Sequence, residues 1–529
     1  MSMLMFGRVG LFLIGVILIA IEFVLAQRPG SRPLSIAAWV IGALLGTHIL
    51  FNLFLWYNHA AFPLNLDLME GTVLQHARQA ATFQPIYPEP SAAYVPLAYN
   101  TLYYLATAPL VNLPGNDMIA LRIFSIAGMA GSALLVFLLV RHHTQSAVWS
   151  LVAIGLFAAA YRTMDAYLDT AHSDSWFLFT ALLGTYLLVL DRGRRWNLAA
   201  IVILVASFWF KQHGALFTVG GVVALTWREG LRRSWPYWMV AALLGPGLYL
   251  LGPMVLGPRF HFFTLEVPRA WSELSLRGLL RYSSFAIFNY GVLAILGGWF
   301  SLHALVRHPP APDVLAVQFC AALFTGLLGT LDPGSSDNVY IPMGTFFIIS
   351  GTIGLQRLTQ QYTVVSRYRL HLLALFASLA LLLYNPLNVI TSTRAATSYA
   401  DLVTTLKSLD GPAYLPSVGQ LAYDYETYPA AHWVALEDMV RGPGKVVADH
   451  PLVRTILLPS LEPGGPAYIL ANYPLETYEV TAFLNDYYVL KTDFGDRFKP
   501  LRVLPKRWDH GWPRFLYRYD PLAAQAMQR

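Results

Sequence analysis

The sequence has little charge and almost no cysteine. Only 12% of its 529 residues are Asp, Glu, Lys or Arg, whereas a soluble domain usually has about 25%. An ordinary cytosolic enzyme is therefore not expected. Cys320 is the single cysteine, so the chain cannot form an intramolecular disulfide. It lies in the apolar run LAVQFCAALF, where we expect it to pack against a neighbouring helix.

The chain also lacks the familiar nucleotide and metal motifs. It has no Walker A loop, no GxGxxG after a strand, no Cys/His pattern with zinc spacing and no GxSxG elbow. A nucleotide-driven pump and a Rossmann-type sugar-nucleotide enzyme are therefore both poorly supported. No basic run is long enough to predict a nucleic acid partner.

Apolar residues are abundant, and they are concentrated before residue 391. Charged residues number 37 in residues 1–390 and 29 in the 139 residues that follow, so only the second part approaches the charge density of a soluble domain. We predict a mainly α polytopic membrane domain over residues 1–390, followed by a soluble α/β domain over residues 391–529. A helix needs about 20 apolar residues to cross a bilayer, which predicts about twelve spans. The candidate spans are 9–26, 34–57, 119–140, 148–162, 175–190, 197–211, 212–227, 236–256, 285–305, 314–331, 340–356 and 370–390.

Local sequence patterns add detail to each of the two predicted parts. Segments 197–211 and 212–227 form one long apolar stretch, and they are two helices only if the chain turns at Lys211–Gly214. In the soluble part, residues 397–409 have a helical period. AYILA, YYVLKT and RFLYRY have the composition of strands.

The charges of the short connections predict the orientation. Arg is concentrated in alternate connections, which include 27–33, 141–146, 191–197, 307–313 and 357–369. The positive-inside rule places these in the cytoplasm. The amino terminus and the soluble part are then extracytoplasmic, as is a first large loop of about residues 58–118. We therefore expect a bacterial-type cytoplasmic (inner) membrane protein whose acidic loops face outward.

The first outer loop contains DLMEG, with Asp67 and Glu70 three residues apart. On a helix both carboxylates share one face. Such a pair can deprotonate an acceptor hydroxyl or hold a divalent metal. The simpler alternative is a helix start, with Asp67 as the cap and Glu70 as its capping-box partner.

A second polar group lies on the same predicted side. It comprises Asp169, His172 and Asp174 between two spans, and Lys211 at the turn described above. Lys211 is the only lysine among the first 390 residues. An ammonium at this position can bind a phosphate or pair with an outer carboxylate, or it can simply extend toward the headgroups. The acids can equally be helix caps.

Two further segments supply weaker candidates. The 258–284 loop carries Arg259 and Arg269, which can clamp a phosphate or pyrophosphate; the loop can equally be an amphipathic segment facing headgroups. Asn338 and Tyr340 stand at the outer start of a span in DNVYIPMG.

The order of these motifs resembles that of the GT-C superfamily of membrane glycosyltransferases, near the bacterial protein O-mannosyltransferase and aminoarabinose lipid A transferase families. The resemblance covers about residues 60–357 and rests on DLMEG, Tyr94-Val95-Pro96-Leu97, Arg122, Asp174, FWFKQHG and NVYIPMG. This sequence departs from the pattern of the family in two places. The usual adjacent Asp-Glu is here Asp67-x-x-Glu70, and Asn338 stands where the family has an arginine before the late Tyr/Pro segment.

The resemblance implies an inverting transfer of a sugar from a polyprenyl-phosphate donor to a lipid, glycan or protein acceptor at the outer membrane face. It implies that Asp67 or Glu70 is the base, and that Lys211, Arg259 and Arg269 take over the phosphate. It also implies a divalent cation in several members, Mg²⁺ or Mn²⁺, for which Asp67 and Asp174 are the candidate ligands. Two alternatives remain, a transporter or flippase of lipid-linked sugars and a non-catalytic glycan-binding scaffold.

Overall fold

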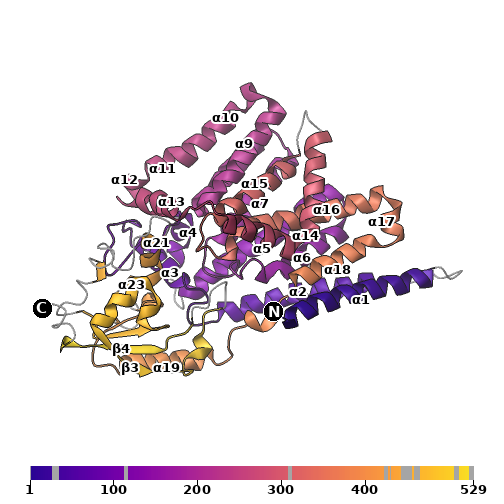
Figure 1. Cartoon of the computed structure of the whole chain (residues 1–529). Helices are drawn as coiled ribbons and strands as arrows, with labels where there is room; N and C mark the ends of the chain where they lie inside the picture. The colour runs from indigo at the N-terminus through magenta and orange to yellow at the C-terminus, as the bar shows by residue number, and fades with distance from the viewer. Residues whose placement is uncertain are drawn as a thin grey trace.

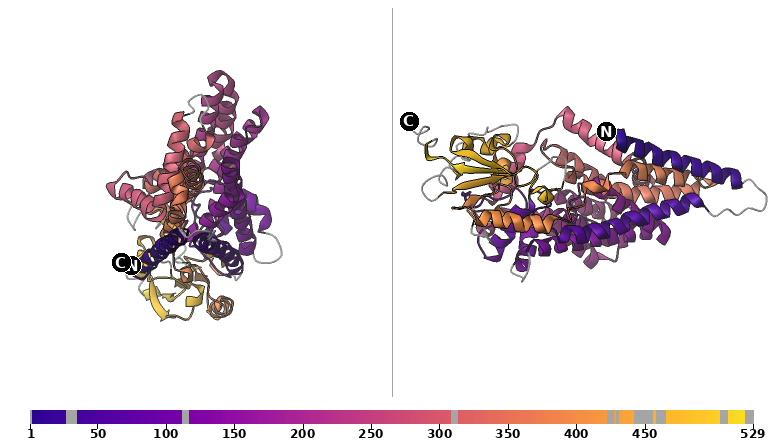
Figure 2. Two further views of the ribbon diagram at one scale, coloured as in Figure 1. Left: turned by 90° about the vertical axis from the view of Figure 1, so that its right-hand side faces the viewer. Right: turned by 90° about the horizontal axis from the view of Figure 1, so that it is seen from below.

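The computed structural model describes residues 2–26, 35–111, 117–307, 313–421, 427–428, 431–441, 456–457, 465–504 and 511–522. The molecule is elongated, and its only β-sheet among these residues lies at one end, beside α19 (Ala395–Lys407) and α21 (Trp433–Val440) (Figures 1 and 2). The remaining length is a bundle of long apolar helices. The predicted connections at 27–33 and 308–312 lie outside the described residues.

The bundle begins with α1 (Ser2–Ala26) and α2 (Ile36–Ala60). Five described helices are long and apolar enough to cross a membrane, and several shorter ones are also apolar. Every predicted span overlaps a helix or a run of helices, but the predicted span 370–390 extends beyond its helix, which ends at Leu382. The number of crossings and the boundary at residue 390 stay predictions. The other long helices are α5 (Asp117–Thr144), α6 (Ala147–Ala159), α7 (Asp174–Leu190), α8 (Arg194–Phe210), α9 (Ala215–Glu229), α10 (Leu231–Ala242), α14 (Leu276–Arg307), α15 (Val314–Thr330), α16 (Ile341–Gln361) and α18 (Leu370–Leu382).

The predicted turn between the two apolar helices at Lys211 is confirmed. Helix α8 ends at Phe210, Lys211 has extended backbone with φ −151° and ψ 134°, and a single 3₁₀ turn leads into α9. A Cβ at Gly214 would overlap the backbone of Ser207 and Phe208. Glycine is therefore required for the close return of the chain, which leaves Lys211 at the end of a helix.

Short helices cover the end of the bundle nearest the sheet. The first loop forms α3 (Glu70–Ala81) and α4 (Leu102–Thr107). A π-helical turn at Leu243–Gly247, which contains Pro246, breaks the run after α10. The chain continues through α11 (Leu248–Leu250), α12 (Gly252–Leu256) and α13 (Val267–Trp271). Helix α17 (Thr363–Arg367) lies at the opposite end of the molecule from the sheet (Figure 1).

The sheet has four strands in the order β1-β2-β4-β3. Strand β1 (Ala413–Tyr414) runs parallel to β2 (Tyr468–Ala471), and the other neighbours are antiparallel. The predicted strands AYILA, YYVLKT and RFLYRY correspond to β2, β3 (Tyr488–Asp493) and β4 (Phe515–Tyr519). The predicted helix over 397–409 corresponds to α19.

The part of the chain that forms α19, α21 and the four strands, here called the sheet domain, packs directly on the first loop. Phe62, Leu64 and Leu66 share one apolar cluster with residues of α19, β1, β2 and β4. The Leu504 amide donates to the Leu66 carbonyl at 3.0 Å, and the Asn65 side chain donates to the Ser417 carbonyl at 3.1 Å. The first loop and the sheet domain therefore lie on the same side of the bundle, as the charge pattern predicts.

Candidate active site

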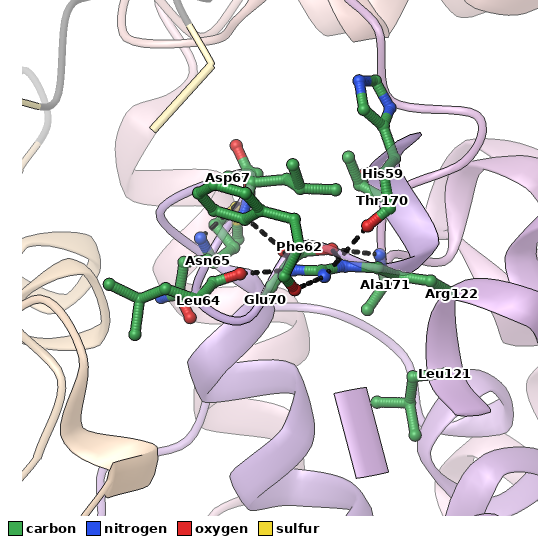
Figure 3. Close-up of polar contacts among 12 residues, drawn as sticks. His59, Phe62, Leu64, Asn65, Asp67, Glu70, Leu121, Arg122, Thr170 and Ala171 are labelled. Atoms are coloured by element: carbon green, nitrogen blue, oxygen red, sulfur yellow. Dashed lines mark hydrogen bonds and ion pairs between the residues drawn. The ribbon is translucent and has the colours of Figure 1, made fainter. Parts of the chain in front are cut away.

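Glu70 lies at the centre of a buried network that fastens the first loop (Figure 3). Its Oε1 accepts from Arg122 Nε at 3.0 Å, and its Oε2 accepts from Arg122 Nη2 at 2.6 Å. The Leu66 and Ala171 amides also donate to this carboxylate, at 2.6 and 2.7 Å. Burial alone would raise the pKa of Glu70, but the Arg122 guanidinium and these donors hold it below its usual value. Glu70 is thus a fully bonded structural carboxylate, and its geometry does not favour the predicted role as a base.

Arg122 uses its other donors to hold the chain that leads into this loop. It donates to the carbonyl oxygens of His59, Phe62 and Leu64 (Figure 3). The guanidinium is completely buried in α5. Its planar fork satisfies carbonyls and a carboxylate at once, which an ammonium cannot do.

Asp67 is also fully buried, but it has a different set of partners. Its Oδ1 accepts from the Met69 amide at 2.9 Å, and its Oδ2 accepts from the Tyr167 hydroxyl at 2.8 Å. The first of these bonds resembles the predicted helix start. No arginine or lysine pairs with this carboxylate among the described contacts. Because Leu68, Met69 and Tyr167 line a large cavity, Asp67 lies directly behind the cavity wall.

The second polar cluster is centred on Asp174, the first residue of α7. Lys211 Nζ donates to Asp174 Oδ1 at 2.7 Å, and Asn338 Nδ2 donates to Oδ2 at 3.3 Å. His172 Nδ1 pairs with the same Oδ2. All four side chains are buried. The tertiary structure therefore brings together four predicted residues from three separate stretches of sequence.

The loop that carries His172 is conformationally strained. Asp165 and Ala166 have φ of 59° and 53°, values that non-glycine residues seldom adopt. Asp165 Oδ2 accepts from the Ser336 hydroxyl at 2.5 Å and from the Asp337 amide at 3.2 Å. These bonds hold the loop against the segment that carries Asn338, and strain of this kind is often stored at functional sites.

Asp169 belongs to a separate buried contact. Its carboxylate accepts from the Tyr161 hydroxyl at 2.6 Å and lies 2.8 Å from His59 Nδ1. His59 Nε2 lies 2.7 Å from the Val389 carbonyl. This network ties α2 to the loop and to the chain after α18. Unlike Tyr167 and Lys211, which contact Asp67 and Asp174, neither His59 nor Tyr161 is among the cavity-lining residues of the described chain. The geometry around Asp169 therefore favours a structural role over the predicted substrate or metal site.

The cavity has a volume of about 1220 Å³. Side chains of α8, α9 and α10, helices that pack on one another, give its lining an apolar part. This apolar part comprises Val205, Phe208, Leu216, Val219 and Trp238. The lining also has polar side chains, among them Lys211, Asn338 and Arg269.

The remaining predicted residues divide between the cavity and its surroundings. Arg269 lines the cavity. Arg259 lies elsewhere, on an exposed ion pair with Glu89 at 2.7 Å, so the predicted phosphate role is not favoured for it. Tyr340 stacks on Phe285 and shares a hydrogen bond with Thr330, so its geometry favours a packing role over the predicted substrate contact.

Sequence reasoning missed the contribution of the sheet domain. Helix α21 lines the cavity with Trp433, Asp438 and the adjoining Arg441. Tyr99 and Tyr167 of the membrane part line it as well. The only sequence signal for this part of the cavity was the pair Asp438 and Arg441, three residues apart. This spacing is common on exposed helices, so it does not predict a site.

The donor set does not fit the predicted metal site. Both Asp174 oxygens receive protein donors, and so do both Asp67 oxygens. Within the described ranges no three His, Cys, Asp or Glu side chains gather in a way that could hold a metal ion. A metal at Asp67 and Asp174 would have to share these oxygens with the Tyr167 and Lys211 donors.

Comparison with solved structures identifies the fold. The chain superposes on ArnT from Cupriavidus metallidurans, both in the apo state and bound to undecaprenyl phosphate, each with a TM-score of 0.52 and 13% identity. These matches cover 91% of this chain and 97% and 98% of those chains. The Archaeoglobus fulgidus oligosaccharyltransferase, solved with Zn and sulfate, matches with a TM-score of 0.44 and 10% identity over 84% of this chain and 71% of that one.

No protein-family profile matches the sequence, and no curated protein matches it either. ArnT is a member of the GT-C superfamily. The fold that the order of the motifs implies is therefore confirmed, and the chain has the fold of ArnT.

Proposed function

We propose that this protein is an inverting glycosyltransferase that moves a sugar from a polyprenyl-phosphate donor to an acceptor at the outer face of the cytoplasmic membrane. The observation that carries the proposal is the two-part cavity. Its apolar part suits a lipid chain, and its polar part begins at Lys211, a buried cation at the end of a membrane helix. ArnT has the same fold and binds undecaprenyl phosphate.

The donor phosphate is assigned to Lys211 and Arg269. Both residues line the cavity. Lys211 is oriented by Asp174, since Asp174 Oδ1 accepts one of its three protons at 2.7 Å. The other ammonium protons can then donate to phosphate oxygens. Charge-assisted bonds of this kind stabilise the negative charge that develops on a departing phosphate.

The base is assigned to Asp67. In the proposed step an acceptor hydroxyl oxygen bonds to the anomeric carbon while the carbon–oxygen bond to phosphate breaks. The bonding pair leaves with the phosphate, and the acceptor proton goes to the Asp67 carboxylate. Attack on the face opposite the phosphate inverts the anomeric centre. Since the Tyr167 hydroxyl donates to Asp67 Oδ2 at 2.8 Å and Tyr167 lines the cavity, we assign Tyr167 the positioning of this carboxylate.

A divalent cation has no step in this mechanism. The candidate ligands Asp67 and Asp174 are bonded to protein donors, and Lys211 already places a positive charge in the cavity. The chemistry of charge neutralisation is therefore assigned to the side chains that are present.

The arrangement favours an enzyme over the two alternatives. Transporters place ionisable groups near the membrane midplane on broken helices, whereas Asp174 begins α7 and Lys211 follows α8. A glycan-binding scaffold would have no need of a buried cation beside a lipid-sized apolar cavity. In such a scaffold the acid-rich first loop would also be dispensable.

Reconstitution of the purified protein in nanodiscs tests the proposal. The assay supplies a set of undecaprenyl-phosphate sugars (hexose, pentose and amino sugar) with an extract of bacterial envelope as the acceptor, and it measures release of undecaprenyl phosphate together with transfer of labelled sugar. We expect release with at least one donor, and loss of release in Asp67→Asn. A flippase would move the labelled lipid across a vesicle membrane without cleaving it, and a scaffold would do neither.

A further inference from the structure

Helix α21 of the sheet domain is fastened to the membrane part beside the cavity. Trp271 Nε1 donates to the Asp438 carbonyl at 2.9 Å. Arg441 pairs with Asp332 at 3.1 Å, and its guanidinium lies 3.9 Å from the centre of the Trp271 ring. These contacts join α21 and the adjoining Arg441 to two segments of the membrane part, those that carry Trp271 and Asp332.

The carboxyl group of Asp438 has one oxygen without a partner. Its Oδ1 lies 2.9 Å from Arg441 Nε. Its Oδ2 is buried and receives no hydrogen bond from the part of the chain that the structure describes. The residue is 5% exposed and lines the cavity. A buried oxygen in this state costs free energy unless a ligand supplies the missing donor.

Asp438 lies close to the proposed phosphate site, because its carbonyl accepts from Trp271, two residues after Arg269 in α13. Tyr99, which also lines the cavity, lies with its ring centre 5.6 Å from that of His172, the partner of Asp174. Burial raises the pKa of Tyr99, and the nearby negative charges of Asp438 and Asp174 raise it further. Tyr99 is therefore within electrostatic range of both acids. A sugar bonded directly to a phosphate in this cavity would share it with Tyr99 and Asp438, which both line it.

The walls around Asp438 suit a sugar ring. Trp433 and Tyr478 line the same cavity and stack on each other with their ring centres 4.1 Å apart. Aromatic rings offer an apolar body with a polar edge, while carboxylates accept bonds from hydroxyl groups. Asp332 and Arg441 add further polar groups to the cavity wall.

We propose that Asp438 is a specificity-determining residue of the donor site, where its unpartnered oxygen accepts a hydrogen bond from a hydroxyl group of the sugar that the lipid carries. This inference rests on the proposed function. It assigns the recognition of the sugar to the sheet domain, and the binding of phosphate and lipid to the membrane part. Burial, with Asp332 and Glu437 nearby, raises the pKa of Asp438 to about 7 against the effect of Arg441. At neutral pH the carboxyl is therefore partly protonated and can also donate to a sugar oxygen.

Equilibrium binding measurements distinguish recognition of the sugar from binding of the phosphate and lipid, and they do not require turnover. The full-length protein in nanodiscs is titrated with undecaprenyl phosphate and with the same lipid bearing a hexose, a pentose or an amino sugar. We expect one sugar-bearing lipid to bind more tightly than the bare lipid. Asp438→Asn should reduce this preference about tenfold and leave the affinity for undecaprenyl phosphate unchanged. Asp496→Asn, which changes an exposed acid of the same domain, should preserve both affinities.

The outcomes that overturn the inference are distinct from failure of the proposed function. A sugar preference in Asp438→Asn within twofold of the parent would overturn the assignment of Asp438, and so would a parent protein with no preference. If the parent bound neither the bare nor the sugar-bearing lipids, the proposed function itself would fail. Asp438→Ser serves as a second variant, and the thermal stability of each variant shows whether α21 remains folded. A reduced affinity for the bare lipid in both variants would assign the residue to packing.

Discussion

Lys211 Nζ lies 2.7 Å from Asp174 Oδ1, and both side chains are almost completely buried. The two residues stand at a helix end and a helix start that meet in space, 37 positions apart in the chain. Both charges are largely removed from bulk solvent, so each stabilises the other. This pair defines the polar end of the cavity.

Replacement of Lys211 should affect both function and stability. We expect Lys211→Gln to lower kcat/KM for the lipid-linked donor by about 10- to 100-fold, because a charge-assisted bond to phosphate is lost. Removing one partner of a buried pair should also destabilise the fold by about 3–5 kcal/mol. Lys211→Arg should recover part of both losses. Lys407→Gln, in the exposed last turn of α19, is the control. Activity of Lys211→Gln within twofold of the parent would remove Lys211 from the site.

Asp67 and Glu70 should behave differently although they are three residues apart. Asp67→Asn should lower turnover by about 100- to 10,000-fold, the usual cost of losing a general base, with donor binding and thermal stability nearly intact. Glu70→Gln should instead lower the unfolding temperature, because Arg122 would lose its buried counter-charge. Thermal unfolding and a transfer assay on the same preparations check both expectations. A stable, inactive Glu70→Gln protein would reverse the assignment of the base.

The two arginines of the 258–284 loop form a matched pair. Arg269 lines the cavity, whereas Arg259 is engaged with Glu89 at the surface. We expect Arg269→Gln to weaken binding of undecaprenyl phosphate by about tenfold. Arg259→Gln should change it by less than about twofold, since exposed ion pairs contribute little. Equal effects of the two substitutions would indicate a general influence of loop charge.

Asp438 should make stability depend on pH in a predictable direction. Its pKa is raised from 3.8 to about 7 by burial, with Asp332 and Glu437 adding to the effect. The unfolded chain ionises this carboxyl at lower pH than the folded protein does. The free energy of unfolding therefore falls as the pH rises from 3.8 to about 7, and it does not fall further above that pH. Between pH 5 and pH 7 the stability should fall by about 2 kcal/mol. Unfolding temperatures of the parent and Asp438→Asn across this range should diverge, and parallel curves would contradict the expectation.

The orientation can be tested by cysteine labelling in a Cys320→Ala background. Gln145→Cys lies between α5 and α6, and Ser408→Cys lies just after α19; both positions are exposed. We expect a membrane-impermeant reagent to label Ser408→Cys in intact cells and Gln145→Cys only after the membrane is opened. The opposite pattern would place the cavity mouth in the cytoplasm and end the glycosyl-transfer proposal.

Removal of divalent cations is a further test of the site chemistry. Because Asp67 and Asp174 are both bonded to protein donors, we expect EDTA to leave the transfer rate within about twofold of its untreated value. A loss restored by Mg²⁺ or Mn²⁺ would show that Tyr167 or Lys211 gives way to a metal in the working enzyme.

The sequence by itself determined the elements of this protein and the local features of its candidate site. Hydropathy located the membrane helices because a bilayer demands long apolar runs. Alternating strand composition located β2, β3 and β4, and the punctuating Gly214 allowed the turn at Lys211. The cluster around Asp174 was also within reach, because its acids, histidine and lysine are conspicuous in an otherwise uncharged context.

Only the tertiary structure decided which of those residues share a site. Glu70 and Asp67 have the same chemistry in sequence, but Arg122, 52 residues away, saturates one and leaves the other to Tyr167. Arg259 and Arg269 look alike in the sequence, and only the folded structure shows that Arg269 lines the cavity and Arg259 does not. Asp438 carries no signal in its own segment, since its burial depends on Trp271 and Asp332 from the membrane part. Local sequence determines helices through short-range periodicity, whereas a buried charge acquires its role from partners that only the folded chain brings near.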